Sequence, residues 1–280
     1  MTSAVSNRIR RSVVAGTWYP GSPSALADAI DQFLAEVDEE PIAGELHGLI
    51  SPHAGYSYSG RVAAHSYKQL EGRSYPTVVV VSPVHQPYGG QYLATSNDYY
   101  ETPLGLVEVD RDTLDAVGRE VQFSYLDWDE EHSLEIQLPF LQHLLGDFSL
   151  VPIMMGEQSL GSCRELSAAL VKVLEGQEAL LVASSDLAHL HDYREVIAHD
   201  QQVQKYVEEF DPEGLAASLV KGEAQACGGG PIITVMLTAK ARGADRATVL
   251  SYMNSGDVTG IRTPGQYTVG YLAAALYKPT

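Results

Sequence analysis

Four side chains that can bind a metal ion lie where a hydrophobic stretch of this sequence gives way to a turn. His53, His85 and His189 each follow a run of apolar residues, and Cys227 comes directly before three glycines. Imidazole and thiolate are the protein groups that bind late first-row metals. In open α/β sheets, ligands collect beyond the carboxyl ends of the strands. The four positions therefore predict one metal-centred site assembled from distant segments.

Asp186 lies three residues before His189, a spacing that could place a carboxylate beside the imidazole. Such a carboxylate would select the tautomer of the ring or raise its basicity. Ser184 and Ser185 come immediately before, so a Ser-His-Asp hydrolase is an alternative, although the Gly-x-Ser-x-Gly signature is missing. Asp186 could also cap a helix that begins at Leu187, and this role is compatible with one in the site.

Cys227 is the most diagnostic of these positions. Pro231 is expected to open a helix after the three glycines, which would place the thiol near the positive end of that helix and lower its pKa. A bound cation would deprotonate the thiol outright. The alternative is a small apolar residue that fills space before a loop. Cys163 lies in an amphipathic helical pattern, so we expect it to be structural and not bridged to Cys227.

Glu131 and His132 follow an acidic stretch and open an expected helix over Ser133–Leu145. A carboxylate near a helix N-terminus is favourable through the helix dipole alone, so Glu131 could be purely structural. His132 could instead contact a metal ligand without binding the metal itself, or it could contact a substrate. The other histidines lie in helical patterns or lack a distinctive sequence context, and we expect no role in the site for them: His47, His65, His143, His191 and His199.

Hydrophobic patterning predicts the elements that must position these residues. Strands are expected over Leu46–Ile50, Thr77–Val81, Phe148–Met154 and Ala179–Ala183, and Thr248–Asn254 and Tyr267–Ala275 are late strands or a strand running into a helix. Helices are expected over Ser22–Glu39, Gly60–Leu70, Ser133–Leu145, Gly161–Leu174, Tyr193–Phe210, Pro212–Lys221 and Pro231–Ala241. The alternation predicts an α/β fold with a central, largely parallel or mixed sheet flanked by helices. We expect a single domain over 13–280 after a flexible N-terminal segment, 1–12.

The composition of the chain limits the kinds of partner that the protein can bind. The formal net charge is −18 and no large basic cluster occurs, which argues against a nucleic-acid partner because phosphate binding needs a concentrated basic surface. No apolar run is long enough to span a bilayer. The first residues lack the apolar segment of a secretory signal. We therefore expect a cytoplasmic protein that binds neither nucleic acid nor membrane.

Five segments of the sequence resemble the Memo family, which in prokaryotes is also called AmmeMemoRadiSam system protein B. The matching segments occur in the family's order and reach across nearly the whole chain, from about residue 13 to 276. They are Ala15–Pro20, Pro52–Gly60, Glu131–Glu135, Ser184–His189 and Ala226–Gly228.

The resemblance implies the fold of the LigB-type class III extradiol dioxygenases, with a pocket at the strand ends. Those enzymes hold non-haem Fe(II) with two histidines and a carboxylate, and a further histidine acts as acid and base. By similarity, His53 and His85 would be the two imidazole ligands and His189 the acid/base residue. Cys227 would be the third ligand, and Asp186 would line the pocket.

The thiolate is where the family departs from the dioxygenases. It makes the site softer, so Fe(II) is favoured by resemblance while Cu or Zn is also compatible. Ring cleavage is therefore not implied by the fold. Two hypotheses follow: a metal-dependent oxidoreductase, or a non-catalytic module that recognises a peptide, a small ligand or a protein partner. The prokaryotic family name contains two candidate partners, an AMMECR1-like protein and a radical SAM protein.

Overall fold

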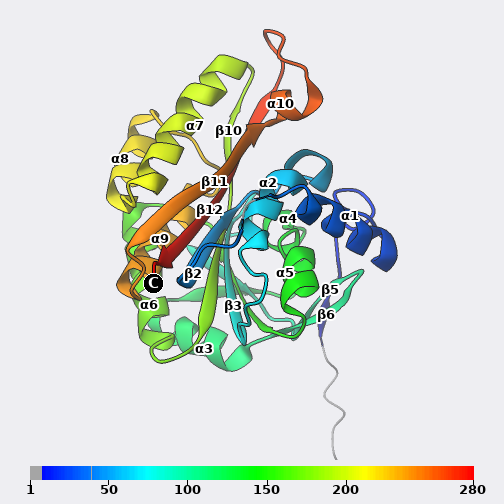
Figure 1. Ribbon diagram of the computed structural model, residues 1–280. Coiled ribbons are helices and arrows are strands. Elements are labelled where there is room, and N and C mark those ends of the chain that lie inside the picture. The colour runs from blue at the N-terminus through cyan, green and yellow to red at the C-terminus, as the bar shows by residue number, and fades with distance from the viewer. Residues whose placement is uncertain (1–7, 39) are drawn as a thin grey trace, which may run out of the picture.

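A mixed sheet of 12 strands runs through the molecule in the computed structural model, which describes residues 8–38 and 40–280 (Figure 1). The strands are β1 Ile9–Arg10, β2 Glu45–Ser51, β3 Thr77–Pro83, β4 Tyr92–Thr95, β5 Tyr99–Thr102, β6 Gly105–Val109, β7 Phe123–Leu126, β8 Ser149–Met155, β9 Ala179–Ser184, β10 Asp186–Leu190, β11 Arg246–Asn254 and β12 Thr268–Lys278. The helices are α1 Pro23–Ala35, α2 Tyr56–Lys68, α3 Arg111–Glu120, α4 His132–Glu135, α5 Leu138–Leu145, α6 Leu160–Val173, α7 Tyr193–Glu208, α8 Pro212–Lys221, α9 Gly229–Ala241 and α10 Ser255–Thr259.

The middle of the sheet is parallel and one flank is antiparallel. Strands β8, β3, β9 and β2 are parallel neighbours in that order, so their carboxyl ends meet at one edge. The last strand, β12, pairs antiparallel with β2, and both β10 and β11 pair antiparallel with β12. The α/β fold with a mixed central sheet, predicted from the sequence, is confirmed.

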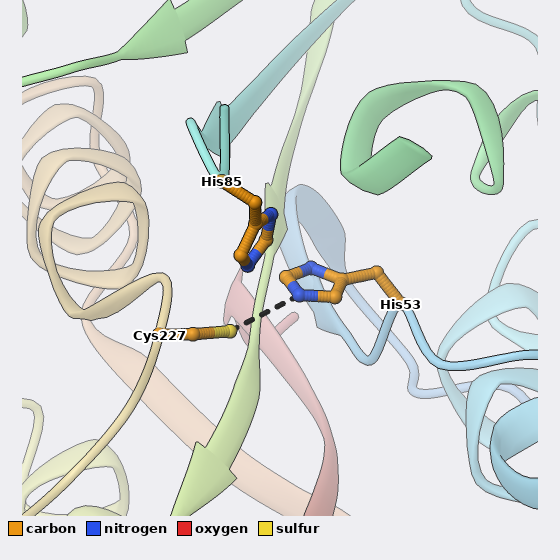
Figure 2. Close-up of side chains that lie close together, drawn as sticks. All are labelled: His53, His85 and Cys227. Carbon is orange, nitrogen blue, oxygen red and sulfur yellow. Dashed lines mark hydrogen bonds between the residues drawn. The ribbon is translucent and has the colours of Figure 1, made fainter. Parts of the chain in front are cut away.

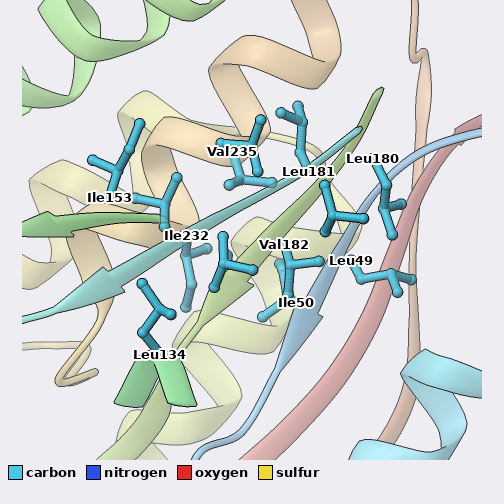
Figure 3. Close-up of a cluster of buried hydrophobic side chains, with 14 of the residues drawn as sticks. Leu49, Ile50, Leu134, Ile153, Leu180, Leu181, Val182, Ile232 and Val235 are labelled. Carbon is cyan, nitrogen blue, oxygen red and sulfur yellow. The ribbon is translucent and has the colours of Figure 1, made fainter. Parts of the chain in front are cut away.

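Helices cover both faces of the sheet. Helix α9 packs on β9, β3 and β2 with α6 and α8 against it, while α2 packs on β12 and β2 beside α1 and α5 (Figure 1). The valines of β3 and the leucines of β9 are fully buried between these layers, as expected for central strands of a doubly covered sheet. Figure 3 shows part of this core, with Leu181 and Val182 of β9 among buried side chains of the neighbouring strands and of the helices on either face.

The expected helix over Ser133–Leu145 is two helices. The prediction of one element was wrong because Pro139 lacks a backbone N–H and its ring clashes with the preceding turn, so α4 ends at Glu135 and α5 begins at Leu138. The break leaves Gln137 between them with its side chain buried. A second difference concerns Asp186, which begins strand β10 and does not cap a helix at Leu187.

The N-terminal end of the described chain is ordered before residue 13. Ile9 and Arg10 form β1, which pairs with β5, and the Arg10 guanidinium is buried in ion pairs with Asp129 and Glu135. The Glu135 carboxylate also accepts hydrogen bonds from the backbone of Val13 and Val14. Of the segment expected to be flexible, 1–12, residues 1–7 lie outside the described residues, and the rest is tied to the fold.

Within the described residues, no helix combines the length and the apolarity that crossing a membrane requires.

Candidate metal centre and its cavity

Three of the predicted metal ligands converge at the carboxyl edge of the sheet. His53 follows β2, His85 follows β3, and Cys227 precedes α9, and Figure 2 shows their side chains pointing toward one another. One ligand atom from each lies within 4.8 Å of the others. Cys227 Sγ and His53 Nε2 are 3.0 Å apart. Parallel pairing of β2 and β3 with the intervening β9 brings the two histidines together.

Glycine lets the Cys227 loop lie directly against the sheet. A Cβ on Gly228 would fall 2.4 Å from the carbonyl oxygen of Ser184, so a larger residue would push the loop away from the end of β9. The backbone N–H of Cys227 donates to the carbonyl of Asp186 (3.2 Å), which fixes the loop.

The expectation of a low thiol pKa is wrong for the metal-free protein. Burial, and then the nearby carboxyl of Asp186, raise the pKa of Cys227 well above its ordinary value. The helix end does not overcome desolvation, so the thiol is neutral until a cation is bound. Both cysteines are free, and Cys163 is buried on α6.

The carboxylate of Glu131 fixes the orientation of His85 through two hydrogen bonds. The Nδ1 of His85 lies 2.9 Å from Oε1 of Glu131, and the other oxygen of Glu131 accepts the backbone N–H of His85 at 2.6 Å. Burial alone would raise the pKa of Glu131, but these hydrogen bonds and one from Ser133 lower it to about 2. The ionised carboxylate places the imidazole proton on Nδ1 and leaves Nε2 free, an arrangement typical of metal-bound histidine.

His132 lies beside the ligands. Its ring stacks on that of His85 with centroids 4.7 Å apart, and the Trp18 ring lies 4.3 Å away on a tilted plane. Burial lowers the pKa of His132 to about 4, so the ring is neutral at neutral pH. With His85 and Glu131 it forms a second group whose ligand atoms lie within 4.8 Å of one another. Glu131 therefore does more than cap a helix, and His132 adjoins the centre.

Asp186 and His189 lie at the same cavity but do not form the expected pair. The carboxylate of Asp186 accepts the backbone N–H groups of His53 (2.7 Å) and Ala54 (3.3 Å). The Nδ1 of His189 instead bonds the carbonyl of Leu187 at 3.0 Å. The regular pairing of β10 with β12 is interrupted by a bulge between residues 186 and 189, and each of the two side chains bonds to backbone groups instead. His189 is also not part of the three-ligand group.

Comparison with known proteins identifies the chain. The family model described as "Memo-like protein" matches residues 10–275. A MEMO1 family protein of Pyrobaculum aerophilum is 34% identical over 97% of this chain and 100% of its own length. One from Ignicoccus hospitalis is 36% identical over 97% of this chain and 99% of its own. The chain belongs to the Memo family. A crystal structure of an uncharacterized protein from Escherichia coli K12 covers 81% of this Memo chain and 99% of that one, with a TM-score of 0.53 and 14% identity, which shows a shared fold.

The centre of this Memo chain opens into a cavity of about 740 Å³. Aromatic and hydroxyl-bearing side chains dominate its walls, and among the described residues that line it there is no lysine or arginine. The lining includes His53, His85, His132, Asp186 and His189, together with Trp18, Ser57, Tyr58, Tyr267 and Tyr271. A site of this composition favours a neutral or aromatic ligand over a polyanion.

Sequence reasoning missed the groups that support His53. Ser184 and Ser185, the two candidate nucleophiles of a hydrolase, are both fully buried and neither lines the cavity, which argues against that alternative. The hydroxyl of Ser184 contacts His53, and Gln137 contacts it in turn. No motif singles out Gln137, because only the break between α4 and α5 brings it to the site.

Proposed function

We propose that His53, His85 and Cys227 hold one divalent or redox-active metal ion, with Fe(II) favoured over Cu or Zn, and that the protein uses a redox-active ion there as an oxidoreductase on a small molecule in the cavity. The convergence of the three ligand atoms within 4.8 Å carries this proposal. Ligand bonds of about 2.0–2.3 Å in a tetrahedral arrangement place ligand atoms roughly 3.3–3.8 Å apart. Two imidazoles and a thiolate suit a late first-row metal and leave positions open toward the cavity.

The residues of the chain supply proton transfer around that centre. Burial lowers the pKa of His189, so its ring is neutral at neutral pH and can take a proton from a ligand in the cavity. Burial raises the pKa of Asp186 to about 7, so this carboxyl can hold or release a proton in the same pH range. A bound metal would supply Lewis acidity or electron transfer.

The ligand class follows from the walls of the cavity. Tyr58 and Tyr267 are exposed at its walls, and Trp18 is partly exposed. These rings suit a flat or phenolic molecule, or an aromatic side chain of a peptide. An AMMECR1-like protein and a radical SAM protein remain the proposed protein partners.

Metal analysis followed by oxygen uptake tests the proposal. We expect the purified protein to hold close to one equivalent of metal, and His53→Ala and Cys227→Ala to lose it. His143→Ala and Cys163→Ala are matched controls, which remove an imidazole and a thiol outside the three-ligand group, and they should retain the metal.

Oxygen uptake with catechol-type substrates then separates the two functions. Turnover by the loaded protein supports the oxidoreductase. Ligand binding without turnover supports the non-catalytic binding module instead. Equal metal content in all five proteins refutes the site itself.

A further inference from the structure

The ring of His53 is held between two groups, one on each nitrogen. His53 is 2% exposed, its Nε2 faces Cys227 Sγ at 3.0 Å, and its Nδ1 faces Ser184 Oγ at 3.0 Å. An imidazole that is to bind a metal ion must be neutral. A neutral imidazole donates from one nitrogen and accepts at the other. The direction of the Ser184 contact therefore decides which nitrogen is free.

The hydroxyl proton of Ser184 is donated to a group other than His53. The hydroxyl oxygen lies 2.5 Å from the backbone carbonyl of Ser133, which can only accept a hydrogen bond. It also lies 2.7 Å from Nε2 of Gln137, which can only donate. The amide of Gln137 cannot be turned around, because its Nε2 also donates to the carbonyl of Pro52 at 3.0 Å and a flip would place two oxygens together. The hydroxyl of Tyr67 donates to the amide oxygen at 2.6 Å.

One lone pair of Ser184 Oγ is then left for His53. We propose that Ser184 is a positioning residue that fixes His53 in the tautomer with its proton on Nδ1, so that Nε2 offers a bare lone pair toward Cys227 and a metal ion. This inference rests on the proposed metal site. The opposite tautomer would leave Nδ1 facing another lone pair, and a buried polar group left without a partner costs about 1–3 kcal/mol.

The tautomers of the two imidazoles of the centre are thus fixed by different groups. A charged carboxylate, Glu131, orients His85, whereas a neutral chain of hydrogen bonds through Ser184 orients His53. A metal ligand must present a deprotonated nitrogen, so neither ring would need to move its proton when the metal binds.

Nitrogen-15 NMR of metal-free, histidine-labelled protein tests the tautomer without any variant. Protonated and bare ring nitrogens resonate in separate ranges, and His53→Gln assigns the signals. We expect Nδ1 to be protonated and Nε2 bare over neutral pH. A proton on Nε2 of His53 overturns the inference, whether or not the protein binds metal.

Metal affinity tests the role of Ser184. Ser184→Ala should weaken binding of the metal about 10–100-fold, the usual cost of removing a group that orients a ligand, and should shift the metal-free His53 toward a mixture of tautomers. Ser82→Ala is the matched control, since Ser82 is equally buried on β3 and its hydroxyl has no hydrogen-bond partner among the described residues. Equal affinities for the two variants overturn the inference. If wild type binds no metal, the proposed function fails while the NMR result still decides the tautomer.

Discussion

Replacing Glu131 with Gln should destabilise the protein at neutral pH and remove part of its sensitivity to acid. The Glu131 side chain is fully buried and accepts hydrogen bonds from the backbone of His85 and Ser133 and from the ring of His85. These contacts lower its pKa from the ordinary 4.5 to about 2. A Gln amide can keep one of the two acceptor positions, but its NH₂ would then face a backbone N–H.

The size of the effect follows from linkage between protons and folding. Because the folded pKa is below the unfolded one, the contribution of Glu131 is complete above about pH 5 and is lost as pH falls from about 4.5 to 2. A difference of about 2.5 in pKa, at about 1.4 kcal/mol for each pKa unit, corresponds to about 3.5 kcal/mol. We expect Glu131→Gln to lose on the order of this free energy of unfolding at pH 7. The variant should also show a smaller drop in stability than wild type between pH 4.5 and 2.

Urea unfolding of metal-free protein at a series of pH values measures the loss of stability at pH 7 and the drop in stability between pH 4.5 and 2. Glu130→Gln is the matched control, because Glu130 is the exposed neighbour and carries the same change of charge. Metal affinity of Glu131→Gln should also fall about 10–100-fold, since His85 loses the carboxylate that fixes its tautomer. The reasoning is refuted if Glu131→Gln and Glu130→Gln have the same stability at pH 7 and the same acid profile.

Three further expectations concern His189, Asp200 and the cysteines. His189→Ala should keep most of the metal yet lose about 10²–10⁴-fold of any turnover as a lost general base; loss of the metal would make His189 a ligand. Burial raises the pKa of Asp200 from 3.8 to about 7, so the folded protein holds a proton that the unfolded chain releases, and stability falls as pH rises from about 4 to 7. Asp200→Asn should make the free energy of unfolding less dependent on pH and raise it by up to about 4 kcal/mol at pH 8, as measured by urea unfolding. An unchanged pH dependence contradicts this prediction. Denatured, unreduced protein should show two reactive thiols, matching the 2 cysteines of the sequence, and finding none would reveal a disulfide.

The sequence was sufficient to predict the sheet and the three converging ligands. Runs such as Val78–Val81 can be stable only in a covered strand, and parallel neighbours deliver the residues that follow them to one edge. The sequence alone therefore predicts that His53 and His85 lie close together. Cys227 could be added because glycines framed it.

The rest of the site depends on contacts that no local pattern encodes. Asp186 bonds the backbone of His53, 133 positions away, and the support of His53 comes from Gln137 at a helix break. The thiol pKa was misjudged because the helix end is visible in the sequence, whereas burial and the nearby carboxyl of Asp186 are not. The bulge between Asp186 and His189 likewise appears only in the pairing of β10 with β12.

The position of β12 sets an order of events during biosynthesis. This strand, Thr268–Lys278, lies between β2, which leads to His53, and β10, which carries Asp186 and His189. Chains are made from the N-terminus, so every proposed ligand leaves the ribosome before the strand that joins the two flanks exists. The strands that bring His53 and His85 together, β2, β9 and β3, are all made before β12. The three-ligand group therefore does not depend on the last strand, whereas the side of the cavity that carries Asp186 and His189 is joined to β2 only when β12 pairs with β10.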